Sequence, residues 1–356
     1  MGTCLHNILE QVTGIERMND ATQSTFSGVS VAVTGADGFI GSHLVEELVH
    51  RGAHVRALVQ YNSMDALGWL DDVNPEIRNE LEVIRGDLRD QSQMIAFCEN
   101  RQLVFHLAAL ISIPFSYDAP SAYIQTNVQG TANILDAALK GGAEKVVHTS
   151  TSEVYGTAIT APIREDHPLQ GQSPYSASKI GADMMATAYQ RSFNCPVVTL
   201  RPFNTYGPRQ SERAVLPTIV RQVVDENCTG ITLGDLSPKR DFCFVKDTVA
   251  AFLAIAGTGP ETNGSVFNAG TGRMVTIEQA LEVVCEITGI EKPISEDAQR
   301  LRPANSEVLV LQADYTKLNN LTGWAPSFTL EQGLARMIDW WRDRGGNWRR
   351  DADYIY

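Results

Sequence analysis

Apolar residues recur along the chain in two alternating patterns. Short runs rich in β-branched residues alternate with longer stretches in which apolar residues recur at helical spacing. The first run covers residues 29–33, and apolar residues at helical spacing follow between positions 40 and 48. Three glycines, at positions 35, 38 and 41, lie at the junction of the two. The pattern therefore predicts a strand, a tight turn and a helix.

The same alternation continues through most of the chain. Strands that alternate with helices form a parallel sheet that is covered by helices on both faces. We therefore predict an α/β fold, a Rossmann-type doubly wound parallel sheet. The expected further strands cover residues 54–59, 81–88, 103–109, 145–149 and 265–270, and the expected later helices cover about 120–140 and 175–193.

From residue 206 onward the alternation weakens, which indicates a second, smaller domain. The late strand at 265–270 returns the chain to the sheet, so we expect this C-terminal domain to be interleaved with the first. The predicted boundaries are 28–205 plus roughly 245–270 for the sheet domain, and 206–244 with 271–356 for the second domain.

Composition and charge narrow the function classes. The chain of 356 residues is 43% hydrophobic and 20% charged, as in soluble globular proteins. Its net charge of −13 disfavours a nucleic-acid partner, because a phosphate backbone requires a basic surface. No apolar run approaches the roughly 20 residues of a membrane span. Residues 1–27 lack the features of a signal peptide and are expected to be an N-terminal extension, a disordered tail or a loosely docked helix.

The six cysteines are scattered and form no C-x-x-C pair. This spacing fits reduced thiols in the cytoplasm better than a disulfide framework or a zinc site. The seven histidines are equally dispersed. We therefore expect a cytoplasmic protein without a metal site.

The turn after the first strand has the glycine spacing of a dinucleotide site. Gly35 permits the tight turn, Gly38 lets the backbone approach a pyrophosphate, and Gly41 allows close packing of helix on strand. The N–H groups and the positive end of the helix dipole then hold the phosphates. Such glycines also occur in ordinary turns, but the flanking strand and helix favour a dinucleotide. The predicted contacts here are Gly35, Gly38, Phe39, Ile40 and Gly41.

The ends of the next three strands complete the predicted cofactor site. An acidic residue at the end of the second strand would bind the adenosine ribose of NAD, and a nearby arginine would favour NADP. The sequence has neither, but Gln60 or Asn62 could bond a ribose hydroxyl, which favours NAD. Asp87 meets the adenine or caps the next helix. The other predicted contacts are Leu88, Leu107, Ala108 and Ala109, where small side chains let a cofactor lie against the backbone.

Polar residues that follow the strand at 145–149 are candidates for catalysis. Ligands bind beyond the carboxyl ends of parallel strands, where Thr151, Ser152 and Glu153 lie, although a hydroxyl-rich helix cap is the structural alternative. Tyr175 and Lys179 are four residues apart, on one helix face. A nearby ammonium lowers the phenol pKa from about 10, so the pair can act as a general base. Tyr-x-x-x-Lys alone is usually a surface pair, but these motifs together indicate a catalytic site.

The combined motifs resemble the extended short-chain dehydrogenase/reductase family, and the likeness runs from about residue 29 to residue 341. It implies an NAD(P) cofactor and, in the nucleotide-sugar branch, a C-terminal domain that binds the nucleotide sugar. It also implies the catalytic roles. Tyr175 removes the C4 hydroxyl proton, Lys179 lowers the pKa of Tyr175 and binds the nicotinamide ribose, and Thr151 orients the sugar hydroxyl. The motifs are Thr34-Gly35-x-x-Gly38-x-x-Gly41, the Thr151 strand end, Tyr175-x-x-x-Lys179 and the segment 201–209.

Within this branch the residue pair after Thr151 separates possible reactions. A 4,6-dehydratase needs a carboxylate to remove the C5 proton, and Glu153 is such a group. Ser152 departs from the Asp-Glu pair of glucose-type dehydratases and resembles the mannose-type enzymes, although UDP-glucuronate decarboxylases share it. The segments 113–117, 168–175 and 300–308 look like N-acetylglucosamine-nucleotide 4,6-dehydratases of the legionaminic acid type.

The resemblance therefore implies a nucleotide-sugar 4,6-dehydratase. It would convert a nucleotide hexose, UDP- or GDP-N-acetylglucosamine, to its 4-keto-6-deoxy derivative. A nucleotide-sugar 4-epimerase and a UDP-glucuronate decarboxylase remain alternatives. A non-catalytic dinucleotide-binding scaffold or sensor is a more remote one, because such proteins commonly lose the tyrosine or the lysine.

The sugar is expected to lie beside the segment that follows the fourth strand, and the nucleotide diphosphate to contact arginines of the C-terminal domain. A guanidinium fork matches phosphate oxygens, although each arginine is alone more often a solvated surface charge. The family resemblance also implies a homodimer through the helices at 120–140 and 175–193. The predicted substrate contacts are Pro114, Asn204, Arg209, Arg240 and Arg302.

Overall fold

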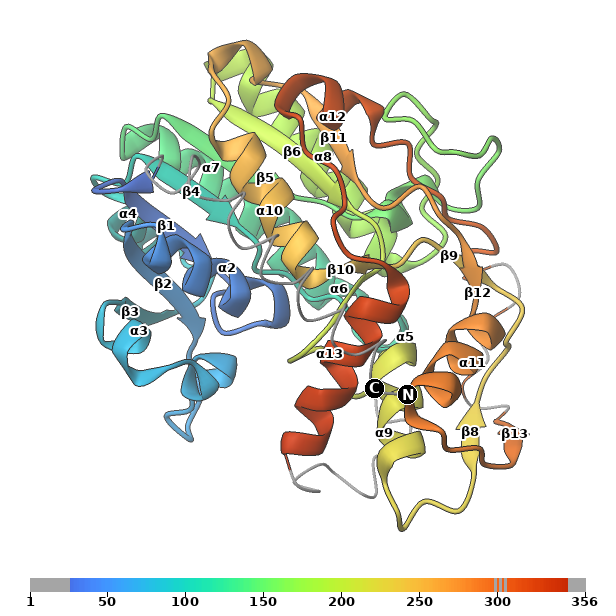
Figure 1. Cartoon of the computed structure of the whole chain (residues 1–356). Helices are drawn as coiled ribbons and strands as arrows, with labels where there is room; N and C mark the ends of the chain where they lie inside the picture. Colours follow the sequence, from blue (N-terminus) through green and yellow to red (C-terminus); the bar gives the residue numbers. More distant parts are fainter. Residues whose placement is uncertain (1–25, 298–299, 301–302, 304–305, 345–356) are drawn as a thin grey trace.

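The centre of the molecule is a sheet of seven parallel strands in the order β11-β6-β5-β4-β1-β2-β3 (Figure 1). This computed structural model describes residues 26–344 except 298–299, 301–302 and 304–305. The winding direction reverses between β1 and β4, so the predicted Rossmann-type doubly wound sheet is confirmed. The strands are β1 (Ser30–Thr34), β2 (His54–Gln60), β3 (Glu82–Gly86), β4 (Leu103–His106), β5 (Lys145–Thr149), β6 (Val197–Pro202) and β11 (Val266–Ala269).

Helices cover both faces because successive side chains of each strand point to opposite sides. In β1, Val31 and Val33 pack into one apolar cluster, and Ala32 packs into another. The first cluster contains the buried faces of α2 (Phe39–His50) and α10 (Val245–Ala256), which lie in front of the sheet in Figure 1. The second contains those of α4 (Gln91–Cys98), α7 (Gly130–Lys140) and α8 (Pro174–Phe193). Burial of these two faces is the main force that holds the sheet domain together.

The helix expected at 120–140 consists of three consecutive pieces. They are α6 (Pro120–Tyr123), the π-helical turn η3 (Ile124–Gln129) and α7. Inside the π-helical turn, the amide of Asn127 donates to the Leu110 carbonyl and to the Ser178 hydroxyl, both at 2.9 Å, and accepts from the Leu110 N–H. The turn therefore joins the segment after β4 to α8, which carries the candidate catalytic residues.

The C-terminal part is built mainly of helices that pack on one another beside the sheet (Figure 1). The buried apolar side chains of these helices belong to the first apolar cluster, the same one that covers the α2 and α10 face of the sheet. The chain leaves the sheet after β6 and returns at β11, so the two parts are interleaved. Its elements are α9 (Val215–Val224), α11 (Ile277–Thr288), α12 (Thr316–Thr322), α13 (Leu330–Asp343) and the paired strands β7 (Thr205–Tyr206) with β10 (Cys243–Phe244), β9 (Lys239–Arg240) with β12 (Val275–Thr276), and β8 (Ile231–Leu233) with β13 (Ile294–Glu296).

Short helical turns connect the larger elements. They are η2 (Gly68–Asp72), α3 (Pro75–Asn79), α5 (Ile113–Asp118), η4 (Ser152–Tyr155) and η5 (Pro260–Thr262). In the described part of the chain, no helix combines the length and the apolar character that a bilayer span requires. The prediction for the N-terminal extension falls on residues 1–25, outside the described residues, except at its last two positions.

Candidate active site

A cavity of about 1010 Å³ lies at the carboxyl ends of the central strands. It spans the point between β1 and β4 where the winding direction reverses, which is where open parallel sheets bind ligands. Its size is at the upper end of the roughly 300–1,000 Å³ of small-molecule sites. The lining comes from the glycine turn, the ends of β2 to β5, the start of α8 and residues 202–214.

The glycine turn has the shape that the sequence predicts. Gly35 has a φ of +67°, and a Cβ atom there would lie 2.8 Å from the backbone nitrogen of Ala108. A Cβ atom on Gly41 would lie 2.0 Å from the Gly35 carbonyl oxygen, so larger residues are excluded at both positions. Gly38 begins α2 without a side-chain cap. The first N–H groups of this 12-residue helix therefore face the cavity as donors for an anion, and the site fits the pyrophosphate of a dinucleotide.

Thr34 fixes the floor of this turn, a role that sequence reasoning missed. Its hydroxyl accepts from the N–H groups of Leu107 and Ala108, both at 3.1 Å, and bonds Nδ1 of His106 at 2.9 Å. The ends of β1 and β4 are thereby held together below the glycines. A buried threonine at the end of the first strand, one residue before the first glycine, is the signal that could have identified it.

Three of the four residues that we predicted to meet the adenosine line the cavity. Gln60, Asp87 and Leu88 line the cavity. The Asp87 carboxylate accepts from Nε of Arg89 at 2.9 and 3.0 Å, and this hydrogen bond holds the pKa of Asp87 below its usual value. Asn62 does not line the cavity in the described structure, because its side chain closes a local turn by bonding the backbone of Ala66 at 2.8 and 3.1 Å.

The candidate catalytic residues meet where β5 ends and α8 begins. Thr151 is the N-cap of η4, and its hydroxyl accepts from the Glu153 N–H at 3.2 Å. The hydroxyl therefore caps a helix, as the structural alternative predicted. Tyr175 and Lys179 extend from α8, and their side chains are 7% and 4% exposed. All of these residues, together with Ser152, line the cavity. The five predicted catalytic residues therefore line one cavity.

The pKa values of Tyr175 and Lys179 are shifted in opposite directions. Burial raises the pKa of Tyr175, while its hydrogen bond with Thr151 lowers it and the nearby charge of Glu153 raises it. Burial lowers the pKa of Lys179 to about 8, and the charge of Asp183 counteracts this. The ammonium of Lys179 donates to the Thr149 carbonyl at 2.7 Å. An additional positive charge in the cavity would therefore promote ionisation of the phenol at neutral pH.

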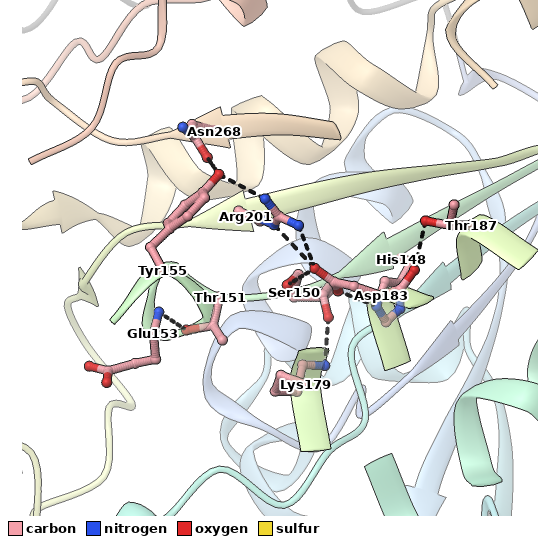
Figure 2. Close-up of polar contacts among 11 residues, drawn as sticks. His148, Ser150, Thr151, Glu153, Tyr155, Lys179, Asp183, Thr187, Arg201 and Asn268 are labelled. Atoms are coloured by element: carbon pink, nitrogen blue, oxygen red, sulfur yellow. Dashed lines mark hydrogen bonds and ion pairs between the residues drawn. The ribbon is translucent and has the colours of Figure 1, made fainter. Parts of the chain in front are cut away.

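Asp183, one turn after Lys179, anchors a buried polar network that sequence reasoning missed (Figure 2). Its carboxylate accepts from the Ser150 hydroxyl at 2.9 Å and from Nη2 of Arg201 at 2.8 Å, and it bonds His148 at 3.2 Å. Arg201 also donates to the hydroxyl of Tyr155 at 2.9 Å. The network fixes α8 against β5 and β6 behind the cavity.

The predicted substrate contacts are only partly brought together. Asn204 and Arg209 line the cavity, but both Nη atoms of Arg209 pair with the Glu46 carboxylate at 2.7 and 2.8 Å. Arg240 is not among the described lining residues and pairs with Glu307 at 2.7 Å.

The two remaining predicted substrate contacts are Pro114 and Arg302. Pro114 does not line the cavity in the described structure, although its neighbour Ile113 does. Arg302 lies outside the described residues. Among the residues that are described, no group of three or more His, Cys, Asp or Glu side chains is arranged to hold a metal ion.

Comparison with known proteins identifies the family. The model of the GDP-mannose 4,6 dehydratase family matches residues 32–337. The chain belongs to this family. A UDP-glucose 4-epimerase from Mycolicibacterium smegmatis is 31% identical over 318 residues, which cover 88% of this chain and 98% of that protein. A dTDP-glucose 4,6-dehydratase from an Actinoplanes species is 30% identical over 329 residues, which cover 90% of this chain and 100% of that protein.

Solved structures support the same assignment. A dTDP-glucose 4,6-dehydratase from Streptomyces venezuelae, crystallised with NAD, has a TM-score of 0.77 at 29% identity and covers 88% of this chain and 98% of that chain. The predicted resemblance to the extended short-chain dehydrogenase/reductases is confirmed at the level of nucleotide-sugar dehydratases and epimerases. Relatives of similar sequence identity carry out different reactions, so membership in the family does not by itself specify the reaction of this protein.

Proposed function

We propose that this family member is an NAD-dependent nucleotide-sugar 4,6-dehydratase that acts on UDP- or GDP-N-acetylglucosamine. The observation that carries the proposal is that Glu153 lines the same cavity as Thr151, Tyr175 and Lys179. A 4-epimerase needs no carboxylate to remove the C5 proton, whereas a 4,6-dehydratase does. The likeness of segments 113–117 and 168–175 to the legionaminic acid type supports N-acetylglucosamine as the sugar.

The dinucleotide fits the glycine turn and the uncapped start of α2. When bound, NAD supplies a hydride acceptor that takes the hydride from C4 of the sugar and returns it to C6. In this proposal Gly35, Gly38 and Gly41 hold the pyrophosphate, and Lys179 holds the nicotinamide ribose. The positive charge of the oxidised ring also promotes ionisation of Tyr175.

The chain's own residues then move the protons. Tyr175 removes the C4 hydroxyl proton as C4 becomes a ketone, and Thr151 orients that hydroxyl. The ketone acidifies the C5 proton, which Glu153 removes and passes to the departing C6 hydroxyl, so that one molecule of water is lost. Return of the hydride to C6 and of a proton to C5 gives the 4-keto-6-deoxy sugar.

The test is to incubate the protein with NAD and UDP- or GDP-N-acetylglucosamine and to measure product mass. We expect a product that is lighter than the substrate by one water. The matched control is Tyr175→Phe, which retains the edge-to-face contact with the Tyr123 ring but lacks the hydroxyl. We expect this variant to lose at least about a hundredfold in rate.

Two results would contradict the dehydratase proposal. A product of unchanged mass would identify a 4-epimerase, and release of carbon dioxide from UDP-glucuronate would identify a decarboxylase. Normal turnover by Tyr175→Phe would remove the assignment of the general base.

We also propose that the protein forms a homodimer through η3, α7 and α8. Two observations support this surface: Ile124 and Met184 are 60% and 48% exposed, and they lie on η3 and α8, which pack against each other. Large exposed apolar side chains on elements that pack together are a feature of protein contacts. Light scattering should give twice the chain mass of 39.0 kDa, and Met184→Glu should shift the mass toward one chain. A single-chain mass for the unmodified protein would overturn the proposal.

A further inference from the structure

The adenosine end of the cavity lacks the acidic residue that usually follows the second strand. In dinucleotide sites of this fold, a carboxylate at that position accepts from the 2′-hydroxyl of the adenosine ribose and selects NAD over NADP. Here β2 ends at Gln60, and the next residues are Tyr61 and Asn62. The side chain of Asn62 is engaged in a local turn. None of these side chains carries a negative charge.

A carboxylate from another element reaches the end of β2. Asp37 lies in the glycine turn, directly before Gly38, and its Oδ2 accepts from the backbone N–H of Gln60 at 3.1 Å. The carbonyl of Asp37 accepts from the N–H of Trp69 at 3.0 Å, so the loop at η2 fixes the backbone of the same residue. Asp37, Gln60 and Trp69 all line the cavity. Contacts on two sides therefore place the carboxylate of Asp37 at the end of β2.

The arginine at this end of the cavity is engaged by another acid. Arg89 lines the cavity, and its guanidinium contacts Asp87 through Nε at 2.9 and 3.0 Å and through Nη2 at 2.5 Å. A phosphate on the ribose would have to compete with Asp87 for this guanidinium. It would also lie near the negative charge of Asp37, and like charges repel strongly where water is partly excluded.

We propose that Asp37 is the residue that selects NAD over NADP in this protein. Its carboxylate takes the place of the missing acid at the end of β2. It accepts from the ribose 2′-hydroxyl, and it disfavours a 2′-phosphate by charge. The inference rests on dinucleotide binding at the glycine turn and is independent of the sugar reaction, because it concerns the opposite end of the cofactor.

The test measures dinucleotide binding by calorimetry with the cofactor-free full chain and no sugar present. Asp37→Asn isolates the charge, because an amide oxygen can still accept from the Gln60 N–H. We expect NAD affinity to fall about tenfold and NADP affinity to rise, so that their ratio changes by about a hundredfold. Asp136→Asn on α7 is the matched control, since it removes the same charge from a residue paired with Lys140 that does not line the cavity.

The ratio of the two affinities decides the outcome. The proposal would be overturned if Asp37→Asn and Asp136→Asn had the same ratio of NAD affinity to NADP affinity. A parallel loss of both affinities in Asp37→Asn would also overturn it, because that result would indicate a structural role in the turn. Preferential binding of NADP by the unmodified chain would also overturn it. Failure of the dehydratase test would leave this result unaffected, because no sugar takes part in the measurement.

Discussion

Glu153 is the carboxylate on which the proposed dehydratase reaction depends. It lies two residues after Thr151, and both line the cavity with Tyr175. The charge of its carboxylate raises the pKa of Tyr175.

Glu153→Gln should separate these two steps. The amide keeps the size of the side chain but cannot accept the C5 proton, so oxidation at C4 continues while elimination stops. We expect the reduced nicotinamide to accumulate, and exchange of the C5 proton with deuterated solvent to fall by about 10²–10⁴-fold. Absorbance and nuclear magnetic resonance would measure the two effects.

A control for this variant is Glu47→Gln on α2, which removes a surface ion pair with Arg51 outside the cavity. Unimpaired water loss by Glu153→Gln would show that another group removes the C5 proton.

Among the elements, α8 positions the candidate catalytic side chains through its helical spacing and its N-terminal cap. Ser173 forms a capping box with Ser176, and Pro174 occupies the first turn, so the helix begins directly before Tyr175. Residues four apart then share one face, which aligns Tyr175, Lys179 and Asp183. Asp183 is the only one of the three that turns away from the cavity lining to meet Arg201 behind it.

Asp183→Asn should destabilise the fold and shift the pH profile. Removal of the carboxylate leaves Arg201 and Lys179 as buried cations without their counter-charge, and breaking such a pair costs about 3–5 kcal/mol. The pKa of Lys179 should fall further, because Asp183 raises it. We therefore expect a lower denaturation midpoint and an alkaline limb of the activity profile that moves to lower pH.

The double variant Asp183→Asn, Arg201→Gln provides the control, since it removes both charges of the pair. It should recover part of the stability but not the position of the alkaline limb. An unchanged pH profile in the single variant would show that Asp183 does not act on Lys179.

At the scale of the whole molecule, buried histidines make the fold sensitive to acid. Burial lowers the pKa of His43 to about 4 and also lowers those of His106 and His148. His43 joins α2 to the C-terminal part through the Pro208 carbonyl at 3.0 Å. In the unfolded chain each histidine takes up a proton near its ordinary pKa of about 6.5. The unfolded state therefore binds more protons below that pH.

The free energy of unfolding should consequently fall as the pH is lowered through about 6.5. His43 alone should account for about 3 kcal/mol by the time the pH reaches 4. The His43→Gln variant cannot take up this proton. The slope of its unfolding free energy against pH should therefore be smaller, by an amount that corresponds to close to one proton. Denaturant titrations at several pH values would measure the slopes, and equal slopes for the two proteins would contradict the assignment.

Features that depend on neighbours along the chain could be predicted from the amino-acid sequence. Alternating patterns gave the parallel sheet, and spacing within single turns placed Gly35, Gly38 and Gly41 at the start of α2. The four-residue interval put Tyr175 and Lys179 on one face of α8. These predictions succeeded because local backbone geometry fixes them, whatever the rest of the molecule does.

The charged and polar groups that a ligand can reach could not be predicted in this way, because they depend on contacts between distant parts of the chain. Arg240 is paired with Glu307, 67 residues further along, and Arg209 with Glu46, 163 residues before it. Asp37 reaches the end of β2 across 23 residues. No periodicity encodes such partners, because a side chain's partner is set by the packing of distant elements. The chain alone therefore predicted the glycine turn and the Tyr175–Lys179 pair, and the fold determined which charged groups line the cavity with them.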